Sequence, residues 1–186
     1  MEGDEKRPED DELLEVVNER NEVIGLLPRR EVHQRGLAHR ASHVFVFNPA
    51  GKLFLQKRAR TKRELPGYFD SSAAGHLQPM ESYEACAGRE LMEELSIAAE
   101  IVRLGGLVAS DENAFEHVGL FACRTDQVPR PDPAEIERGE FYPLDQIDRW
   151  IATGAQLLSP GFVLLYTRHQ SEIRAFLSSS RFLPAL

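Results

Sequence analysis

The amino-acid sequence predicts a mixed α/β fold in which helices cover a β-sheet. Short β-rich runs alternate along the chain with segments whose apolar residues recur every three or four positions. The 186 residues, 42% of them hydrophobic, are enough to form one sizeable core, so we expect a single domain. We assign this domain to residues 11–178, between an acidic leader at 1–10, which we expect to be disordered, and a short tail at 179–186.

The first half of the domain is predicted to contain two hairpins and a short helix. Residues 13–27 (LLEVVNERNEVIGLL) have two apolar runs on either side of a polar turn. Residues 28–36 (PRREVHQRG) predict a helix that begins after a proline and ends at a glycine. Residues 43–58 (HVFVFNPAGKLFLQKR) predict a second hairpin, and a short extended piece follows at 68–77.

The second half is predicted to begin with a helix at 81–95, where an apolar residue stands at every fourth position from 83 to 95. Gly88 within this helix costs about 1 kcal/mol relative to alanine, which indicates tight packing against a neighbouring segment. The remaining elements are predicted as strands at 101–109, 116–124 and 139–142, followed by helices at 143–150 and 160–176.

The charge distribution excludes some partners and indicates a local anion site. A net charge of −8 and a pI near 5.3 argue against binding to a nucleic-acid polymer or to an anionic membrane surface. Between Arg29 and Arg63, however, ten basic residues stand against a single acid, Glu31. A basic segment inside an acidic protein favours a site for a small anion.

The sequence features that report on cellular compartment favour the cytoplasm. Cys86 and Cys123 form neither a metal-ligand spacing nor a disulfide framework. The first twelve residues are acidic and lack the apolar core of a secretory signal, and no apolar run has the length of a membrane span. We therefore expect a cytoplasmic protein without membrane contact, and the sequence carries no signal for an oligomeric state.

Three glutamates on the predicted helix at 81–95 pose an electrostatic question. Glu90, Glu93 and Glu94 are spaced three and four residues apart, where like charges repel by a few tenths of a kcal/mol per pair on an isolated helix. For an arbitrary helix they would form a solvated face. Here an irregular loop after Gly75 leads into the helix, and Mg²⁺ is bound by carboxylates together with backbone carbonyls. A bound cation would convert the repulsion into coordination.

Residues 75–97 (GHLQPMESYEACAGRELMEELSI) resemble the signature of the Nudix hydrolase superfamily. That signature is a glycine, five residues, a glutamate, seven residues, Arg-Glu, an apolar residue, any residue, Glu-Glu, any residue, a glycine and an apolar residue. The positions in register are Gly75, Glu81, Arg89, Glu90, Leu91, Glu93, Glu94 and Ile97. Ser96 replaces the second glycine, and we expect local strain there where the chain leaves the helix.

The resemblance implies an α/β/α sandwich with a mixed sheet that holds Mg²⁺ or Mn²⁺ against a small-molecule diphosphate. Glu90, Glu93 and Glu94 would be the metal ligands, directly or through water, and the carbonyl of Gly75 would complete the site. A bound cation neutralises the charge of a phosphoanhydride and activates the attacking water.

Further roles follow from the same resemblance. Glu81 and Arg89 would hold the loop and the helix in position through polar contacts. The general base would be Glu93 or Glu94, or an acid from a later loop, for which Glu135 is the candidate. As an isolated residue, Glu135 could equally be an exposed loop acid.

Residues 37–76 are similar to isopentenyl diphosphate isomerases and their hydrolase-like relatives. The shared features are a His-Arg before the first core strand, an Arg and a Lys four residues apart, a Pro-Gly and a Gly-His. On this resemblance Arg58 and Lys62 would bind the diphosphate of the substrate, which fits the basic segment. The alternative for both is a solvated edge of a hairpin.

The sequence departs from the isomerases at the residues that perform the isomerisation. Ala74 stands where the isomerase has its cysteine, and Ala114 replaces the first of two acidic ligands, of which Glu116 is the second. The isomerase's metal-binding histidines are matched at His39, His76 and, after a one-residue gap, His33. Without the cysteine there is no evident acid to protonate carbon, so we interpret these residues as inherited scaffold.

The resulting prediction is a metal-dependent hydrolase that cleaves a phosphoanhydride linkage, for example in a nucleoside diphosphate attached to another group. Two alternatives remain at this stage. One is an isopentenyl diphosphate isomerase-like enzyme, and the other is a catalytically silent module that binds a nucleotide or diphosphate. The substrate and the number of metal ions are not specified by the signature.

Overall fold

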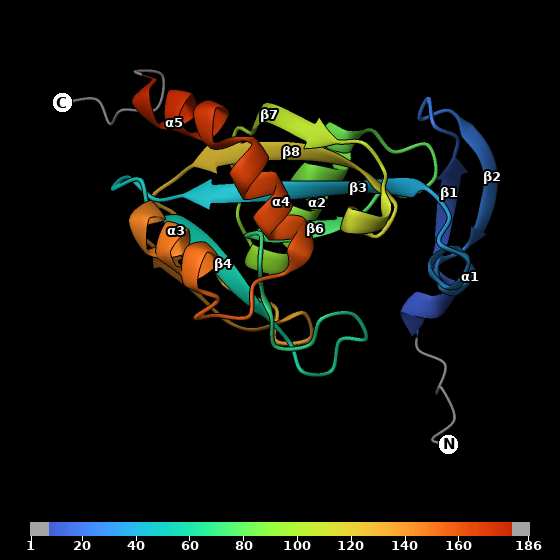
Figure 1. Ribbon diagram of the computed structural model, residues 1–186, viewed down its shortest axis with the longest axis horizontal. Helices are drawn as coiled ribbons and strands as arrows, with labels where there is room; N and C mark the ends of the chain where they lie inside the picture. The colour runs from blue at the N-terminus through green and yellow to red at the C-terminus, as the bar shows by residue number, and fades with distance from the viewer. Residues whose placement is uncertain (1–7, 180–186) are drawn as a thin grey trace.

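A seven-stranded mixed β-sheet forms the centre of the structure, a computed structural model that describes residues 8–179 (Figure 1). Its strands are β3 (His39–Phe47), β4 (Leu53–Arg58), β5 (Phe69–Asp70), β6 (Ala73–His76), β7 (Val102–Leu107), β8 (Glu116–Arg124) and β9 (Ile136–Tyr142). The strand order is β5-β4-β3-β8-β7, with β6 paired to β3 and β9 paired to β4.

The pairing of β3 brings the chemically important residues together. β3 and β8 are parallel, with His39 opposite Glu116, whereas β6 runs antiparallel to β3 and places His43 opposite Ala74. Because successive side chains in a strand point to opposite faces, Gly75 and His76 face opposite sides of the sheet. Adjacent residues of β6 therefore point to different sides of the sheet, although both border the same cavity.

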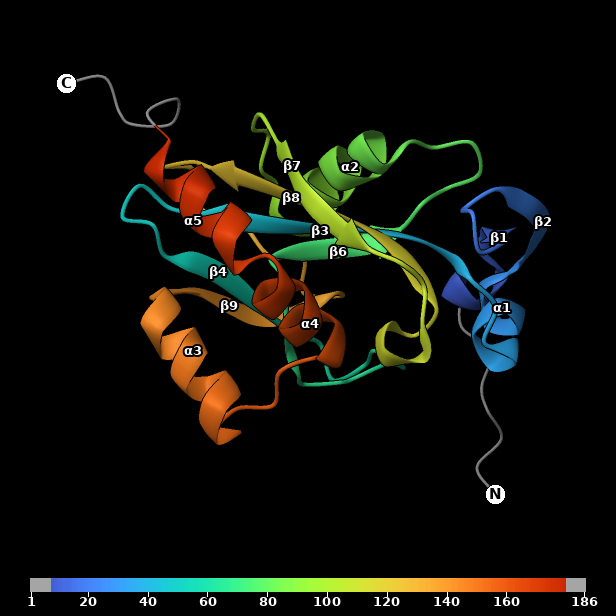
Figure 2. The same cartoon turned by 45° about the horizontal axis from the view of Figure 1, so that its top comes forward.

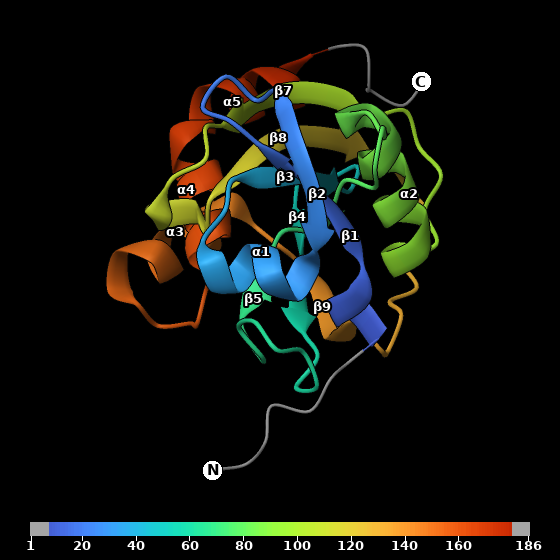
Figure 3. The same cartoon turned by 90° about the vertical axis from the view of Figure 1, so that its right-hand side faces the viewer.

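Helices cover both faces of the sheet, as Figure 3 shows. They are α2 (Tyr83–Leu95) on one face and α3 (Leu144–Thr153), α4 (Pro160–Arg168) and α5 (Gln170–Ser178) on the other. Val44 and Val46 of β3 pack in the cluster that includes Leu91 of α2, whereas Phe45 and Phe47 pack in the cluster of α3, α4 and α5. Each such buried side chain contributes about 1.5–3 kcal/mol. The predicted α/β/α arrangement with a mixed sheet is confirmed.

A small N-terminal unit lies at one end of the main sheet (Figure 2). It comprises η1 (Pro8–Asp11), the antiparallel pair β1 (Leu13–Val17) and β2 (Val23–Pro28), and α1 (Arg29–Arg35). Leu14, Val16 and Val32 form its core. The predicted hairpin and short helix are confirmed. The predicted leader mostly lies outside the described residues, but η1 begins at residue 8, so regular structure starts before the predicted boundary at 11.

The segment predicted as one C-terminal helix is two helices that meet at His169, whose φ of −113° interrupts the helical backbone. The His169 ring explains the break, because its Nε2 accepts the N–H of Gly106 at 3.2 Å and its Nδ1 contacts the carbonyl of Leu165 at 3.0 Å. The ring fits only because Gly105 has no side chain, since a Cβ there would lie 2.3 Å from Nε2. No local pattern in the sequence reports this contact.

Helix α2 is defined by its two ends. Ser82 caps the first turn by accepting the N–H of Ala85 at 3.1 Å. At the other end Ser96 adopts the left-handed conformation (φ 55°, ψ 37°), the position for which glycine is the usual residue. The strain predicted at Ser96 is therefore present. The tight packing predicted at Gly88 is wrong, because a Cβ built there meets no atom within 4 Å.

The remaining predictions about compartment are tested only in part. In the portion of the chain that the structure describes, no helix combines the length and the apolar character that crossing a bilayer requires. Cys86 and Cys123 are buried free thiols, and burial raises the pKa of each to about 12. Both thiols are therefore neutral at physiological pH.

Candidate active site

A cavity of about 930 Å³ opens where β6 ends beside α2. Its wall is formed by residues from α2, β3, β6, the N-terminal unit, the loops after β4 and before β8, and the N-terminus of α4. Of the twelve predicted site residues, ten line this cavity: Arg58, Lys62, Gly75, His76, Arg89, Glu90, Glu93, Glu94, Glu116 and Glu135. The other two, His39 and Glu81, contact residues of its wall.

The contact between Gly75 and Glu90 explains why a glycine is needed in β6. A Cβ at Gly75 would lie 2.0 Å from Oε1 of Glu90 and 2.2 Å from its Cδ. The carboxylate therefore rests directly on the backbone of the strand, on the α2 face of the sheet. This arrangement brings a carboxylate and a strand backbone together, which is the oxygen-rich environment that a hard cation requires.

Glu94 is the most enclosed of the signature acids, with 6% of the residue exposed. Its Oε2 accepts hydrogen bonds from Nε2 of Gln56 at 3.0 Å and from the N–H of Ala74 at 3.2 Å. Burial, reinforced by the charge of Glu90, raises the pKa of Glu94 well above its ordinary value. Burial also raises the pKa of Glu90. A buried acid beside a partly buried one favours a proton or a cation between them.

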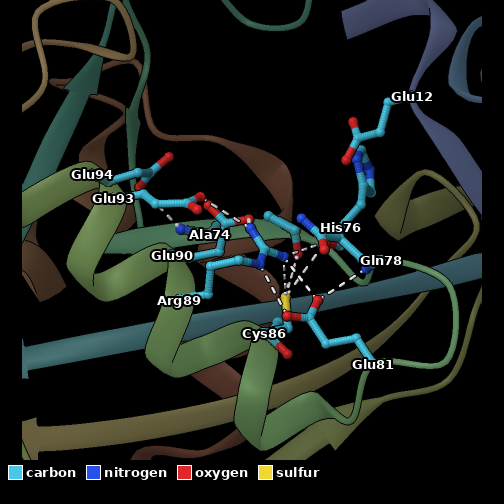
Figure 4. A network of polar contacts seen from close by, with 12 residues as sticks. Glu12, Ala74, His76, Gln78, Glu81, Cys86, Arg89, Glu90, Glu93 and Glu94 are labelled. Atoms are coloured by element: carbon cyan, nitrogen blue, oxygen red, sulfur yellow. Dashed lines mark hydrogen bonds and ion pairs between the residues drawn. The ribbon is translucent and has the colours of Figure 1, made fainter.

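Arg89 lies at the centre of the polar network in Figure 4. Its Nε and one terminal nitrogen donate to the two oxygens of Glu81, each at 2.9 Å, while the other terminal nitrogen donates to Glu90 at 2.5 Å and to Glu93 at 3.1 Å. A further bond reaches the carbonyl of His76 at 3.1 Å. The hydrogen bond to Glu81 is the main reason why the pKa of Arg89 is raised, and the pKa of Glu81 is correspondingly lowered. This geometry supports the predicted positioning role of Arg89 and Glu81.

A second cluster lies on the opposite face of β6. Among residues 8–179, His33, His39 and His76 form the group of metal-binding side chains whose ligand atoms all lie within 4.8 Å of one another. Oε1 of Glu116 lies 3.5 Å from Nε2 of His76 and 3.9 Å from Nε2 of His39. We call these four residues the histidine centre. Among the described residues, the ligand atoms of the signature glutamates do not gather as closely as those of the three histidines.

The histidine centre is suited to a metal ion because two of its ring nitrogens lack hydrogen-bond partners in the described residues. Nε2 of His33 and Nε2 of His39 are buried and have no hydrogen-bond partner in the described part of the chain, although burying an unpaired polar atom costs about 1–3 kcal/mol. Burial lowers the pKa of His76 to about 3 and also lowers that of His33. Neutral imidazoles are the form that binds metals. The burial of Glu116 opposes its ionisation, but contacts with His43 and His76 outweigh it and lower its pKa.

The predicted diphosphate-binding residues lie in the same cavity and are already paired with acids. Nζ of Lys62 contacts Oε2 of Glu135 at 2.7 Å. The residue predicted to bind the substrate is thus paired with the acid predicted as an alternative general base. Arg58 lies 3.6 Å from Asp70 and donates to the carbonyl of Glu64 at 3.1 Å. The first residues of α4 also line the cavity, and a helix N-terminus favours anions.

Some residues of this site were not predicted from the sequence. His43 lines the cavity and lies 3.9 Å from Oε2 of Glu116. Its spacing of four from His39 in a strand places both on one face, so the period-2 pattern could have identified it. Glu12 and Arg29 of the N-terminal unit, which form an ion pair at 3.5 Å, reach the cavity only through tertiary packing.

Comparison with known proteins relates this geometry to a family. The family model for the NUDIX domain matches residues 37–160. An uncharacterised Nudix hydrolase of Pseudomonas aeruginosa is 37% identical over 133 residues, which cover 71% of this chain and 79% of that protein. An isopentenyl-diphosphate Delta-isomerase of Serratia proteamaculans is 35% identical over 146 residues, covering 74% and 79% respectively.

The crystal structure of DR0079 from Deinococcus radiodurans superimposes with a TM-score of 0.76 at 27% identity, covering 85% of this chain and 99% of that one. The structural match covers a larger share of the chain than residues 37–160, which the family model matches. Relatives of two kinds, hydrolases without an established substrate and isomerases, thus share most of their length with this chain.

Proposed function

Because this chain belongs to the Nudix family, we propose that it is a divalent-cation-dependent hydrolase of the phosphoanhydride bond in a small diphosphate compound. One observation carries the proposal. The carboxylate of Glu90 lies against the backbone of Gly75 beside the buried Glu94, inside a cavity that Arg58 and Lys62 also line. Acidic side chains that can hold a cation and positively charged side chains that can hold a diphosphate therefore face the same cavity.

The cation, Mg²⁺ or Mn²⁺, would be held by Glu90, Glu94 and the carbonyl of Gly75, with Glu93 beside them; we call these four residues the carboxylate site. The fit rests on the carboxylate of Glu90 lying against the backbone of Gly75 beside the buried Glu94. The raised pKa values of both acids agree with it, since a cation would remove the penalty of ionising them together. When bound, the cation neutralises charge on the diphosphate and activates water.

We assign the general base to Glu93. Its side chain is 58% exposed, whereas Glu94 is held by two hydrogen bonds and Glu135 is paired with Lys62. A base must reach a water molecule within hydrogen-bond distance, and Glu93 is the signature acid with the freedom to do so. Arg89 donates to Oε2 of Glu93 at 3.1 Å, which limits the rotation of the carboxylate.

Arg58 and Lys62 bind the diphosphate of the substrate. A guanidinium can make two parallel hydrogen bonds to a phosphate, and an ammonium contributes a point charge. In the described structure their partners are Asp70 and Glu135, so both cations are already held at the cavity wall. Substrate oxygens would replace or extend these contacts.

The histidine centre would hold a second, softer ion such as Zn²⁺ or Co²⁺. The interpretation of these histidines as inherited scaffold does not account for the two buried ring nitrogens that have no hydrogen-bond partner among residues 8–179. Three imidazoles and one carboxylate are a suitable ligand set for such ions.

The histidine centre also favours a second candidate function, that of an isopentenyl diphosphate isomerase-like enzyme, since isomerases are among the relatives. Ala74 argues against it, because no cysteine lines the cavity in the described part of the chain. The thiol of Cys86 contacts the carbonyl of Gly75 at 3.5 Å but is buried outside the cavity wall.

The test is a screen of diphosphate compounds with Mg²⁺ or Mn²⁺ in which phosphate and monophosphate products are measured. Hydrolysis of at least one class that disappears with chelator and in Glu93→Gln supports the proposal. The matched control is Glu84→Gln, because Glu84 lies on the same helix and its side chain is also 58% exposed, while it pairs with Arg103 outside the cavity. Conversion of isopentenyl to dimethylallyl diphosphate would support the isomerase instead, and binding without turnover would indicate the silent module.

A further inference from the structure

We propose that His43 and Ser71 position Glu116 as a ligand in the histidine centre. The inference rests on the proposed second metal ion and concerns two residues outside the signature. Among the described residues, no hydrogen bond or ion pair joins either residue to the three ligand histidines. His43 faces Glu116, and Ser71 contacts His43.

The two oxygens of Glu116 face in different directions. Oε1 lies 3.5 Å from Nε2 of His76 and 3.9 Å from Nε2 of His39, whereas Oε2 lies 3.9 Å from Nε2 of His43. His39 and His43 are four residues apart on one face of β3, a spacing of roughly 13 Å along a strand. His43 is therefore placed to hold the second oxygen of Glu116 while the first oxygen faces the ion.

The ring of His43 is itself held in a defined orientation. Its Nδ1 contacts Oγ of Ser71 at 2.8 Å, and both residues are buried. If the serine hydroxyl donates to Nδ1, the remaining ring proton is on Nε2 and points toward the carboxylate of Glu116. The distance of 3.9 Å is longer than a hydrogen bond, and a movement of about 1 Å would close it.

Ser71 is fixed in turn by the end of α4. The N–H of Ser71 donates to Oδ1 of Asp70 at 2.8 Å, and the same oxygen accepts the hydroxyl of Ser159 at 2.8 Å. Ser159 is the N-cap of α4. The ring of His43 is therefore held by Ser71, whose backbone is in turn held through Asp70 by the N-cap of α4. A residue that positions a metal ligand needs such fixed support.

Contacts of this kind determine how well a site holds its metal. Carboxylate ligands are usually hydrogen-bonded by a second residue, and loss of that partner typically costs 10–100-fold in metal affinity. Without His43, Glu116 would keep one oxygen near the histidines but lose the contact that fixes its rotation. We therefore expect weaker binding at the histidine centre and no effect on the carboxylate site, which lies on the other face of β6.

The test is a titration of the metal-free protein with Co²⁺, followed by its visible absorption spectrum and by competition with a chelator. His43→Phe keeps the size of the ring and removes the donor, and Co²⁺ affinity is expected to fall about 10–100-fold. His43→Gln places an amide nitrogen near the position of Nε2 and should restore most of the affinity. Ser71→Ala removes the partner of Nδ1 while keeping His43, and should weaken binding in the same direction.

Two controls separate positioning from a general loss of structure. His117→Gln alters a buried histidine that is next to Glu116 in sequence but faces the other side of β8, and should bind Co²⁺ like the unmodified protein. Mg²⁺-dependent thermal stabilisation, which reports on the carboxylate site, should be the same in all variants. Unchanged Co²⁺ affinity in His43→Phe and Ser71→Ala would overturn the proposal, as would the absence of a one-to-one Co²⁺ complex in the unmodified protein. Since the readout is metal affinity and not turnover, a failure of the proposed hydrolase activity would be seen separately.

Discussion

Replacing Gly75 with alanine tests whether the close contact between Glu90 and the β6 backbone is needed for cation binding. The added Cβ would lie 2.0 Å from Oε1 of Glu90 and 2.8 Å from Oε2. Non-bonded carbon and oxygen atoms lie roughly 3.5 Å apart, so the carboxylate must move by about 1.5 Å. Mg²⁺ binds its ligands at about 2.0–2.1 Å and tolerates little deviation. Gly75→Ala should therefore remove Glu90 from the carboxylate site.

The magnitude of the effect differs between stability and binding. The atoms that the new Cβ would meet are the end of the flexible Glu90 side chain, which can move aside without disturbing the fold. The protein would lose the hydrogen bond between Glu90 and Arg89, which lowers its stability by about 1–2 kcal/mol. Loss of a direct ligand should weaken Mg²⁺ binding about 100-fold, at the upper end of what loss of an outer contact causes. With Mg²⁺ at 100 times the original Kd, ligand stabilisation would fall from about 2.7 kcal/mol to about 0.4 kcal/mol.

The assay is chemical unfolding with and without Mg²⁺, with calorimetric titration as a direct measure of Kd. Gly88→Ala is the matched control, because it is the same substitution at an exposed position of α2 where the Cβ meets nothing within 4 Å. It should stabilise the protein by about 0.5–1 kcal/mol and leave the Mg²⁺ effect unchanged. If Gly75→Ala retained the full Mg²⁺-dependent stabilisation, the assignment of Glu90 as a ligand would be refuted.

Three further predictions concern the end of α2, the buried acid and the anion site. Ser96→Gly should stabilise the protein by about 1 kcal/mol in urea unfolding, because the residue has φ 55° and glycine adopts this conformation without penalty; a loss of stability would contradict this. Glu94→Gln should stabilise the metal-free protein at neutral and higher pH while abolishing Mg²⁺ binding. The pKa of Glu94 is raised in the folded state, so the wild-type acid is destabilising once it ionises, and the advantage of glutamine should disappear as the pH falls from that raised pKa toward the ordinary value of 4.5. An advantage independent of pH would show that ionisation is not the cause. Lys62→Met should lower kcat/KM about 10–100-fold, mainly through KM, because it removes a charged contact to the diphosphate while keeping the apolar stem; an unchanged KM would exclude Lys62 from substrate binding.

Local patterns in the sequence were sufficient to predict the main strands and the covering helices, and the family resemblance identified ten residues of the cavity wall. In β3 the alternation of Val44 and Val46 with Phe45 and Phe47 reflects burial on both faces, and each set packs against a different helical layer. The carboxylates of the signature helix are adjacent in sequence, so one period places them together.

Contacts between distant segments could not be predicted in this way. His33 reaches His39 and His76 from the N-terminal unit, and the bond between Lys62 and Glu135 joins positions 73 residues apart. The break at His169 depends on the absence of a side chain at Gly105. Such contacts are set by tertiary packing, which local periodicity does not encode.

A crystal structure with Mn²⁺, using anomalous scattering to locate the ion, would test the central claim most directly. The account predicts an anomalous peak within ligand distance of Glu90, Glu94 and the carbonyl of Gly75, in addition to any ion in the histidine centre. A peak at the histidine centre alone, with Glu90 still bonded to Arg89 and Glu94 to Gln56 as in the structure described above, would contradict the proposed hydrolase site.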